Sequence, residues 1–239
     1  MRFYGLTLLA LSCLVAFPGS TAVQLAPIRV FSANGTQASN FALELRGVIR
    51  QVPVDQLEKL VQTYLLNDAE FQGLIRVVNS LPAYRFIRQV GNQPEVRQLQ
   101  QWITQQLILS GGSPKIFEYL ELEIKIFNKY PYWSQIVSGI QGFQQEFVQI
   151  YPVQLIRSLL EPSSTQTSPL LSELWRRLVA LRPVYERVIA SPQGKAITGE
   201  LQRVGLDING VDSLIRYQFG WSNATWGVPS YDYSDNLYY

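Results

Sequence analysis

The chain has no histidine, and its only cysteine is Cys13. These absences exclude catalytic triads and general bases that need an imidazole, and zinc sites built from cysteine and histidine. A single cysteine also excludes an internal disulfide, so stability must come from the burial of apolar side chains. Catalysis by lysine, tyrosine or carboxylates stays formally open. No residues stand out for it, and we expect a protein that is not an enzyme and carries neither a cofactor nor a metal ion.

Charge is also scarce. Charged residues make up 16% of the chain, and 20 basic side chains nearly balance 18 acidic ones. Such a balance gives neither the basic footprint of a nucleic-acid-binding protein nor a basic face for an anionic membrane. We therefore expect no nucleic-acid partner.

Long apolar runs are missing beyond the N-terminus. There, Arg2 precedes an apolar run at residues 6–17. This pattern predicts a secretory signal peptide over residues 1–22, because the run is shorter than the roughly 20 residues of a membrane-spanning helix. We expect a secreted, extracellular protein without a transmembrane segment. Asn34 and Asn223 begin Asn-X-Thr sequons and are candidate sites of glycosylation, which would make the protein a glycoprotein.

Apolar side chains at helical spacing dominate residues 40–221. Leu57, Leu60 and Val61, for example, fall on one face of a predicted helix. No run shows sustained strand alternation, so the predicted fold is all-α. The segment 115–128 is apolar nearly all round and is predicted to be a helix buried on every side.

Polar residues and prolines mark the expected starts of these helices. The predicted N-caps are Asp55, Asn67, Ser168 and Asp212. Further starts are predicted at Pro94, Pro152 and Pro192.

One stretch of the sequence occurs twice. NDAEFQGLIRVVNSLPAY, at residues 67–84, matches SPLLSELWRRLVALRPVY, at residues 168–185, with a constant offset of 101 residues. The match pairs Pro82 with Pro183 and continues downstream in both copies. The offset of 101 residues exceeds the periods of common solenoid repeats, so we expect two copies of one unit that close on each other.

The duplication sets the predicted domain boundaries. Two homologous multi-helix repeats, at about 52–127 and 147–219, form one helical domain over residues 40–221. An N-terminal segment, 23–39, precedes the domain. The tyrosine-rich tail, 222–239, has no helical pattern and is expected to be disordered.

Two segments carry a resemblance to a known family. NDAEFQGLIRVVNSLPAYRFIRQVGNQPEVRQLQQWI and GELQRVGLDINGVDSLIRYQFGW resemble the insect allergen-related repeat family, which includes the group-one cockroach allergen, midgut microvillar proteins and nitrile-specifier proteins. The resemblance implies two helical repeats that wrap an apolar cavity holding fatty acids or phospholipids. It also implies a secreted protein of the insect digestive tract, such as the midgut.

The residues alone leave two interpretations of the apolar faces open, an ordinary packed core or a cavity wall. With the resemblance, these faces become candidate lipid-binding positions: Phe71, Leu74, Ile75, Val78, Leu120, Ile124, Phe143, Phe147, Leu174 and Leu178. An acyl chain of about 14 methylenes gains roughly 11 kcal/mol gross on burial, so no polar clamp is required. Arg76 or Arg177 could nevertheless hold a carboxylate head group.

Two other functions stay open at this point. Tyrosines beside acidic residues in the tail could bind or cross-link an extracellular matrix, such as a gut lining or an eggshell. A specifier-like protein would instead redirect the breakdown products of dietary toxins, and no residues of this chain can be assigned to that activity.

Overall fold

The computed structural model describes residues 2–3, 40–113, 116–117, 122–123, 137–162 and 168–222. The predicted signal peptide beyond Phe3, the segment 23–39 and the tail from residue 223 lie outside this part of the chain. The two sequons, Asn34 and Asn223, lie outside it as well.

Helices make up nearly all of the described chain, which confirms the predicted all-α class. The first group is α2 (Phe41–Ile49), α3 (Val54–Asn67), α4 (Ala69–Val78), α5 (Leu81–Gly91) and α6 (Pro94–Leu109). The second group is α7 (Gly139–Ile150), α8 (Val153–Leu160), α9 (Pro169–Val179), α10 (Arg182–Ile189), α11 (Pro192–Arg203) and α12 (Ile208–Gln218). None of the described helices is long and apolar enough to cross a membrane.

Prolines mark helix starts where the sequence predicted them. Pro94 and Pro192 are the first residues of α6 and α11, where a missing N–H costs nothing, and Pro152 directly precedes α8. Pro82 and Pro183 lie in the first turns of α5 and α10. The prolines therefore set where several of the helices begin.

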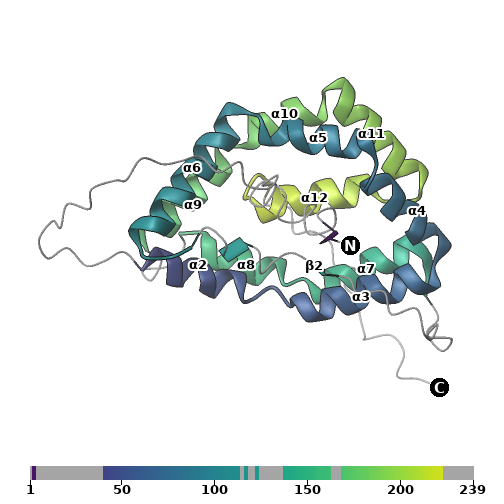
Figure 1. The fold of residues 1–239 in the computed structure, drawn as a ribbon, viewed down its shortest axis with the longest axis horizontal. Coiled ribbons are helices and arrows are strands. Elements are labelled where there is room, and N and C mark those ends of the chain that lie inside the picture. The colour runs from purple at the N-terminus through teal and green to yellow at the C-terminus, as the bar shows by residue number, and fades with distance from the viewer. Residues whose placement is uncertain are drawn as a thin grey trace, which may run out of the picture.

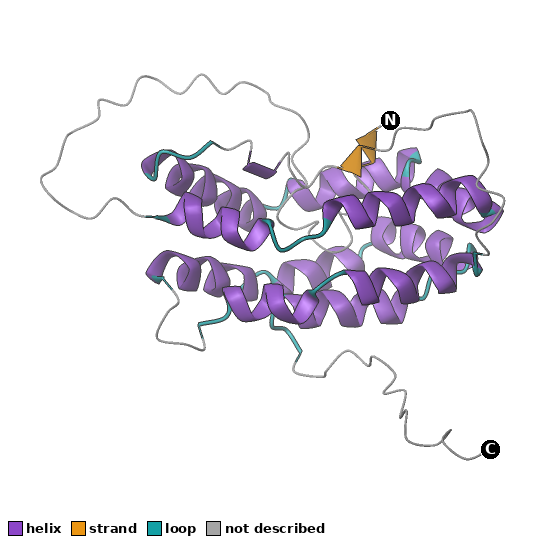
Figure 2. Cartoon of the chain, turned by 90° about the horizontal axis from the view of Figure 1, so that it is seen from below, coloured by secondary structure: helices purple, strands orange, loops and turns teal. Residues whose placement is uncertain are grey.

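The helices form an elongated ring (Figure 1). Helices α2 to α6 follow one another around the ring in one direction, and α7 to α11 follow it in the other. Figure 2 shows the helices arranged as two stacked layers. Contacts between the groups pair α2 with α8 and α9, α7 with α3 and α4, and α5 with α10 and α11. Helix α12 crosses the middle of the ring and contacts α8 and α11.

One short segment differs from its predicted structure. Leu122–Glu123 forms strand β2, which pairs antiparallel with β1 (Arg2–Phe3), so the helix predicted over residues 115–128 is wrong at these two positions. The sequence LELEIKI, residues 120–126, alternates apolar and charged side chains with the period of a strand. This alternation explains why Leu122 and Glu123 form a strand.

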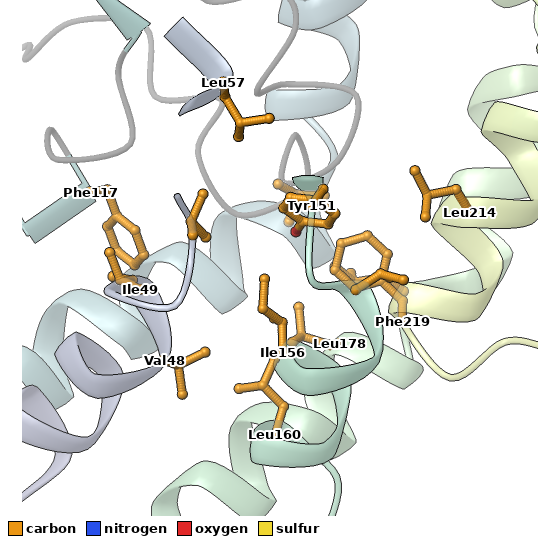
Figure 3. Packing of buried hydrophobic residues seen from close by; sticks show 14 of the residues in the cluster. Val48, Ile49, Leu57, Phe117, Tyr151, Ile156, Leu160, Leu178, Leu214 and Phe219 are labelled. Carbon is orange, nitrogen blue, oxygen red and sulfur yellow. The ribbon is translucent and has the colours of Figure 1, made fainter. Parts of the chain in front are cut away.

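The core lies where helices of the two groups pack against each other. Figure 3 shows Val48 of α2 beside Ile156 and Leu160 of α8, with Leu178 of α9 and Phe219 close by. All five side chains are buried. Packing of α2 on α8 and α9, together with the packing of α8 on α9, therefore buries this part of the apolar surface.

Helix α4 begins one residue later than predicted. The Asp68 carboxylate caps it by accepting a hydrogen bond from the Phe71 backbone N–H at 2.6 Å. Asn67, the predicted cap, is the last residue of α3, and its side chain donates to the Thr63 carbonyl at 2.8 Å. The equivalent predicted cap at Ser168 is confirmed.

Two further predicted caps are wrong. Asp55 lies inside the first turn of α3, where Pro53 holds the N-cap position. Asp212 lies in the middle of α12, which is capped by Asp207 accepting from the Gly210 N–H at 3.1 Å. Asp and Asn side chains that fall close together offer several cap positions, and local sequence alone does not rank them.

We expect Asp68→Ala to lower the free energy of unfolding by about 1 kcal/mol, the usual loss when a capping oxygen is removed. Asn67→Ala should change it by less, because Asn67 caps no helix. Urea denaturation of both variants measures the difference. Equal losses in the two variants would contradict the assignment of the cap.

Candidate functional site

An apolar pocket of about 420 Å³ lies between α5, α10, α11 and α12. The end of α4 and the start of α6 complete its wall through Val78 and Val96. A volume of this size falls within the range of small-molecule sites in proteins. The pocket joins helices of both groups, so neither group could form it alone.

Helical spacing explains why the wall is apolar. Phe86 and Val90 of α5 are four residues apart, as are Val184 and Val188 of α10, so each pair occupies one face of its helix. The same spacing brings further side chains to the pocket from the other two helices: Ile197 and Leu201 of α11, and Ile208, Val211 and Ile215 of α12. The wall is therefore continuous aliphatic and aromatic surface over most of its area.

Polar side chains gather at one part of the wall, where Tyr185, Asp212 and Arg216 line the pocket. The Tyr185 hydroxyl donates to Asp212 Oδ1 at 2.7 Å, and Arg216 Nε donates to Asp212 Oδ2 at 2.7 Å. Arg216 also pairs with Glu186 at 3.2 Å, and Arg182 pairs with the same carboxylate at 2.9 Å. We call these five residues the polar cluster. Two positive and two negative side chains make it electrically neutral.

Ion pairing keeps the charges of the polar cluster fixed. The Arg182 guanidinium, and then that of Arg216, hold the pKa of the Glu186 carboxyl below its usual range. The hydrogen bond to Asp212 is the main reason why the pKa of Arg216 is raised. Both groups therefore stay charged at physiological pH, and the cluster offers a permanently polar edge to an apolar pocket.

Helix α12, one wall of the pocket, is held at both ends. At its start, the Gln144 side chain accepts from the Asp207 N–H at 3.0 Å and donates to the Asp207 carbonyl at 3.3 Å. At its end, the buried Arg157 donates through Nη1 to the Tyr217 and Ser222 carbonyls, both at 3.1 Å. Its guanidinium also lies over the Tyr217 ring at 4.5 Å.

A glycine lets the chain turn back after α12. Gly220 has a φ of 69°, and a Cβ there would lie 2.5 Å from the Trp175 ring, so no other residue fits. The turn places the Trp221 indole N–H within 3.1 Å of the Val179 carbonyl. The end of α12 is thereby fastened to α9.

Of the ten predicted lipid-binding positions, Val78 lines this pocket. Leu120 and Ile124 lie outside the described residues. The others belong to the buried core or pack against it and are absent from the pocket wall: Phe71, Leu74, Ile75, Phe143, Phe147, Leu174 and Leu178. The residues that do form the wall, on α5 and α10 to α12, show the same helical periodicity, which the sequence analysis did not single out.

The two arginines considered for a head group lie away from the pocket wall. Arg76 is exposed on α4. Arg177 pairs with Glu173 at 2.7 Å and lies 4.8 Å over the Trp102 ring. Arg216 of the polar cluster is the arginine that lines the pocket.

Within the part of the chain that the structure describes, no three side chains of a kind that binds metal come together. The pocket wall is apolar except at Thr198, at Asn209 and at three members of the polar cluster, Tyr185, Asp212 and Arg216. Such a wall suits a ligand with a long apolar part and one polar end.

Tyr64 is a buried tyrosine whose ionisation should be visible in the stability of the protein. Its hydroxyl donates to Glu146 Oε1 at 2.6 Å, and its ring packs on those of Phe71 and Phe143. Burial first, and the Glu146 hydrogen bond second, raise the pKa of Tyr64 from 10.0 to about 12. The folded state therefore holds this proton more tightly than the unfolded state does.

Because the folded state binds the extra proton, stability should fall as the pH rises from 10 to about 12. Below pH 10 the contribution is fully present. Urea denaturation across this range should show a smaller decline for Tyr64→Phe, which has no phenol to ionise. An identical decline in both proteins would show that Tyr64 does not hold its proton in this way.

Comparison with known proteins finds one family model that matches the chain. Residues 40–212 match a family model described as insect allergen related repeat, nitrile-specifier detoxification. The match begins directly before α2 and ends within α12, so it contains both groups of helices. A search of curated proteins gives no match.

Proposed function

Because the chain belongs to the insect allergen-related repeat family, we propose that it is a secreted, non-enzymatic protein that binds the acyl chain of a fatty acid or phospholipid. The observation that carries the proposal is the apolar pocket of about 420 Å³ between α5, α10, α11 and α12. Secretion would follow from the signal peptide at residues 1–22, whose removal would also remove β1.

The proposal includes two repeats that close on each other around an apolar interior. Equivalent helices support it: α4 and α9, like α5 and α10, are related by the offset of 101 residues. The contacts are reciprocal too, since α2 packs on α8 and α9 while α7 packs on α3 and α4. The pocket is found where the two groups meet across α5, α10 and α11.

The energy available from the pocket supports an acyl ligand. At about 0.8 kcal/mol per buried methylene, roughly ten methylenes would supply about 8 kcal/mol before the entropy of binding is subtracted. Useful affinity then needs no strong polar clamp. A polar head group would lie beside the polar cluster, where Arg216 and Tyr185 border the apolar wall.

A specifier-like function is the second candidate, because the family description names nitrile-specifier detoxification. It predicts that adding the protein to a glucosinolate hydrolysis reaction shifts the products from isothiocyanates to nitriles. A matrix role through the tyrosine-rich tail, residues 222–239, predicts instead that deleting residues 223–239 abolishes retention on chitin. Neither outcome is expected of a lipid carrier.

Mass spectrometry of an organic extract tests the leading proposal. We expect the protein secreted by insect cells to yield acyl lipid in stoichiometric amount, and an unrelated secreted control to yield none. An extract without lipid, together with no uptake of a fluorescent fatty acid by the purified protein, would refute the lipid-binding function.

A further inference from the structure

Exposed apolar side chains gather at one corner of the ring. Among the described residues, eight large apolar side chains are exposed, and five of them belong to α2, the end of α6 and α8. These five are Leu43, Ile108, Leu109, Leu155 and Leu159. Leu43 is 64% exposed and Leu109 66% exposed, so neither contributes much to the core. Single exposed apolar residues are ordinary, but a group on neighbouring helices is not.

The three helices lie next to one another. Helix α2 contacts both α6 and α8, and Figure 1 shows α2 and α8 along the same edge of the ring. The start of α2 meets the chain just after α6, since a Cβ on Gly112 would lie 2.6 Å from the Ala42 Cβ. Leu43 and Leu109 therefore belong to the same corner of the molecule.

Two arginines join the apolar side chains. Arg46 lies three residues after Leu43 in α2, and Arg50, the C-cap residue of α2, lies seven residues after it. This spacing places all three on the same side of the helix. Both arginines are exposed, and neither forms an ion pair within the described residues. Of the nearby acidic side chains, Glu161 is neutralised by its pair with Arg157, whereas Glu44 accepts a hydrogen bond from the uncharged Ser168 and keeps its charge. The two arginines therefore exceed the remaining negative charge by one.

We infer that this corner, the docking face, binds the surface of an anionic lipid membrane. It is defined by Leu43, Arg46, Arg50, Leu109, Leu155 and Leu159. Leucines that project from adjacent helices can enter the boundary between head groups and acyl chains, while the two arginines pair with anionic head groups. Because the whole chain is nearly neutral, its net charge does not reveal this local positive charge. The inference does not depend on the pocket, and it gives a lipid carrier a place to exchange its ligand.

Vesicle flotation of the full secreted protein tests the docking face. We expect binding to vesicles of phosphatidylcholine with phosphatidylserine, and weaker binding to phosphatidylcholine alone. Arg46→Gln with Arg50→Gln should weaken binding to the anionic vesicles about 30-fold, since each basic residue near such a surface contributes about fivefold. High salt should weaken the wild-type protein in the same direction.

A second variant tests the apolar part. Leu43→Ser, Leu109→Ser and Leu155→Ser together should weaken vesicle binding about 100-fold, or roughly fivefold for each leucine. Leu81→Ser and Arg203→Gln serve as matched controls, because both side chains are exposed and lie outside the docking face. Thermal unfolding and uptake of a fluorescent fatty acid in solution should stay unchanged in every variant.

Three results of the vesicle experiments would overturn the inference. They are equal binding to neutral and anionic vesicles, no binding to either, and equal losses in the control variants. A change of oligomeric state in the leucine variant, measured by light scattering, would instead assign the face to a second copy of the chain and refute the membrane role. Failure of fatty-acid uptake with vesicle binding intact would refute the pocket function alone.

Discussion

Replacing Val90 and Val211 by tryptophan is expected to weaken fatty-acid binding about 100-fold while the protein stays folded. Both valines line the pocket, one from α5 and one from α12, and both are only partly buried. Two indoles would occupy space for about four methylenes, which corresponds to a loss of about 3 kcal/mol. Displacement of a fluorescent fatty acid measures the change in affinity.

The matched control for this experiment is Val179→Trp. Val179 is 36% exposed on α9 and does not line the pocket, so the same substitution should leave fatty-acid affinity unchanged. Circular dichroism confirms that each variant keeps its helices. Wild-type affinity in the Val90 and Val211 double variant would show that the lipid binds elsewhere.

Phe71→Ala is expected to lower the free energy of unfolding by about 4 kcal/mol, the largest effect of any single substitution proposed for this chain. Phe71 has no exposed surface. The centroid of its ring lies 4.5 Å from the ring centroid of Phe143 and 5.7 Å from that of Tyr64. Truncation leaves a void in a packed aromatic cluster. Urea denaturation measures the loss directly.

Phe86→Ala provides the comparison, because Phe86 is partly exposed and lines the pocket. We expect it to cost less stability, about 1 to 2 kcal/mol, and to alter fatty-acid affinity. The reverse pattern, a stable Phe71→Ala protein with weakened lipid binding, would place Phe71 at the ligand and not in the core.

The helical architecture could be predicted because it depends on short-range patterns. Apolar spacing indicates a helix wherever one face is buried, and prolines such as Pro94 and Pro192 begin helices for a local steric reason. Exact caps are harder, since Asn67 and Asp68 are adjacent and both can accept the required hydrogen bond. Strand β2 requires a partner far away in the chain, and the partner Arg2–Phe3 lies in a segment read as a signal peptide.

The pocket could not be located in the same way. Phe71 and Phe86 both occupy apolar faces of amphipathic helices, and nothing in their local sequence separates them. What differs is the opposite surface: Phe71 meets the rings of α3 and α7, whereas Phe86 borders open space between α5 and α12. The way the two groups of helices pack decides which apolar face is buried against another helix and which one lines the pocket.

Photocrosslinking tests the central claim most directly. A fatty acid carrying a diazirine near the middle of its chain would be bound to the purified protein and irradiated. Its attachment sites would then be mapped by mass spectrometry. We predict crosslinks on α5 and α12, at or beside Phe86, Val90, Val211 and Ile215, that disappear when unlabelled fatty acid competes. Competable crosslinks confined to residues outside the pocket wall, or none at all, would contradict the assignment of the pocket as the lipid site.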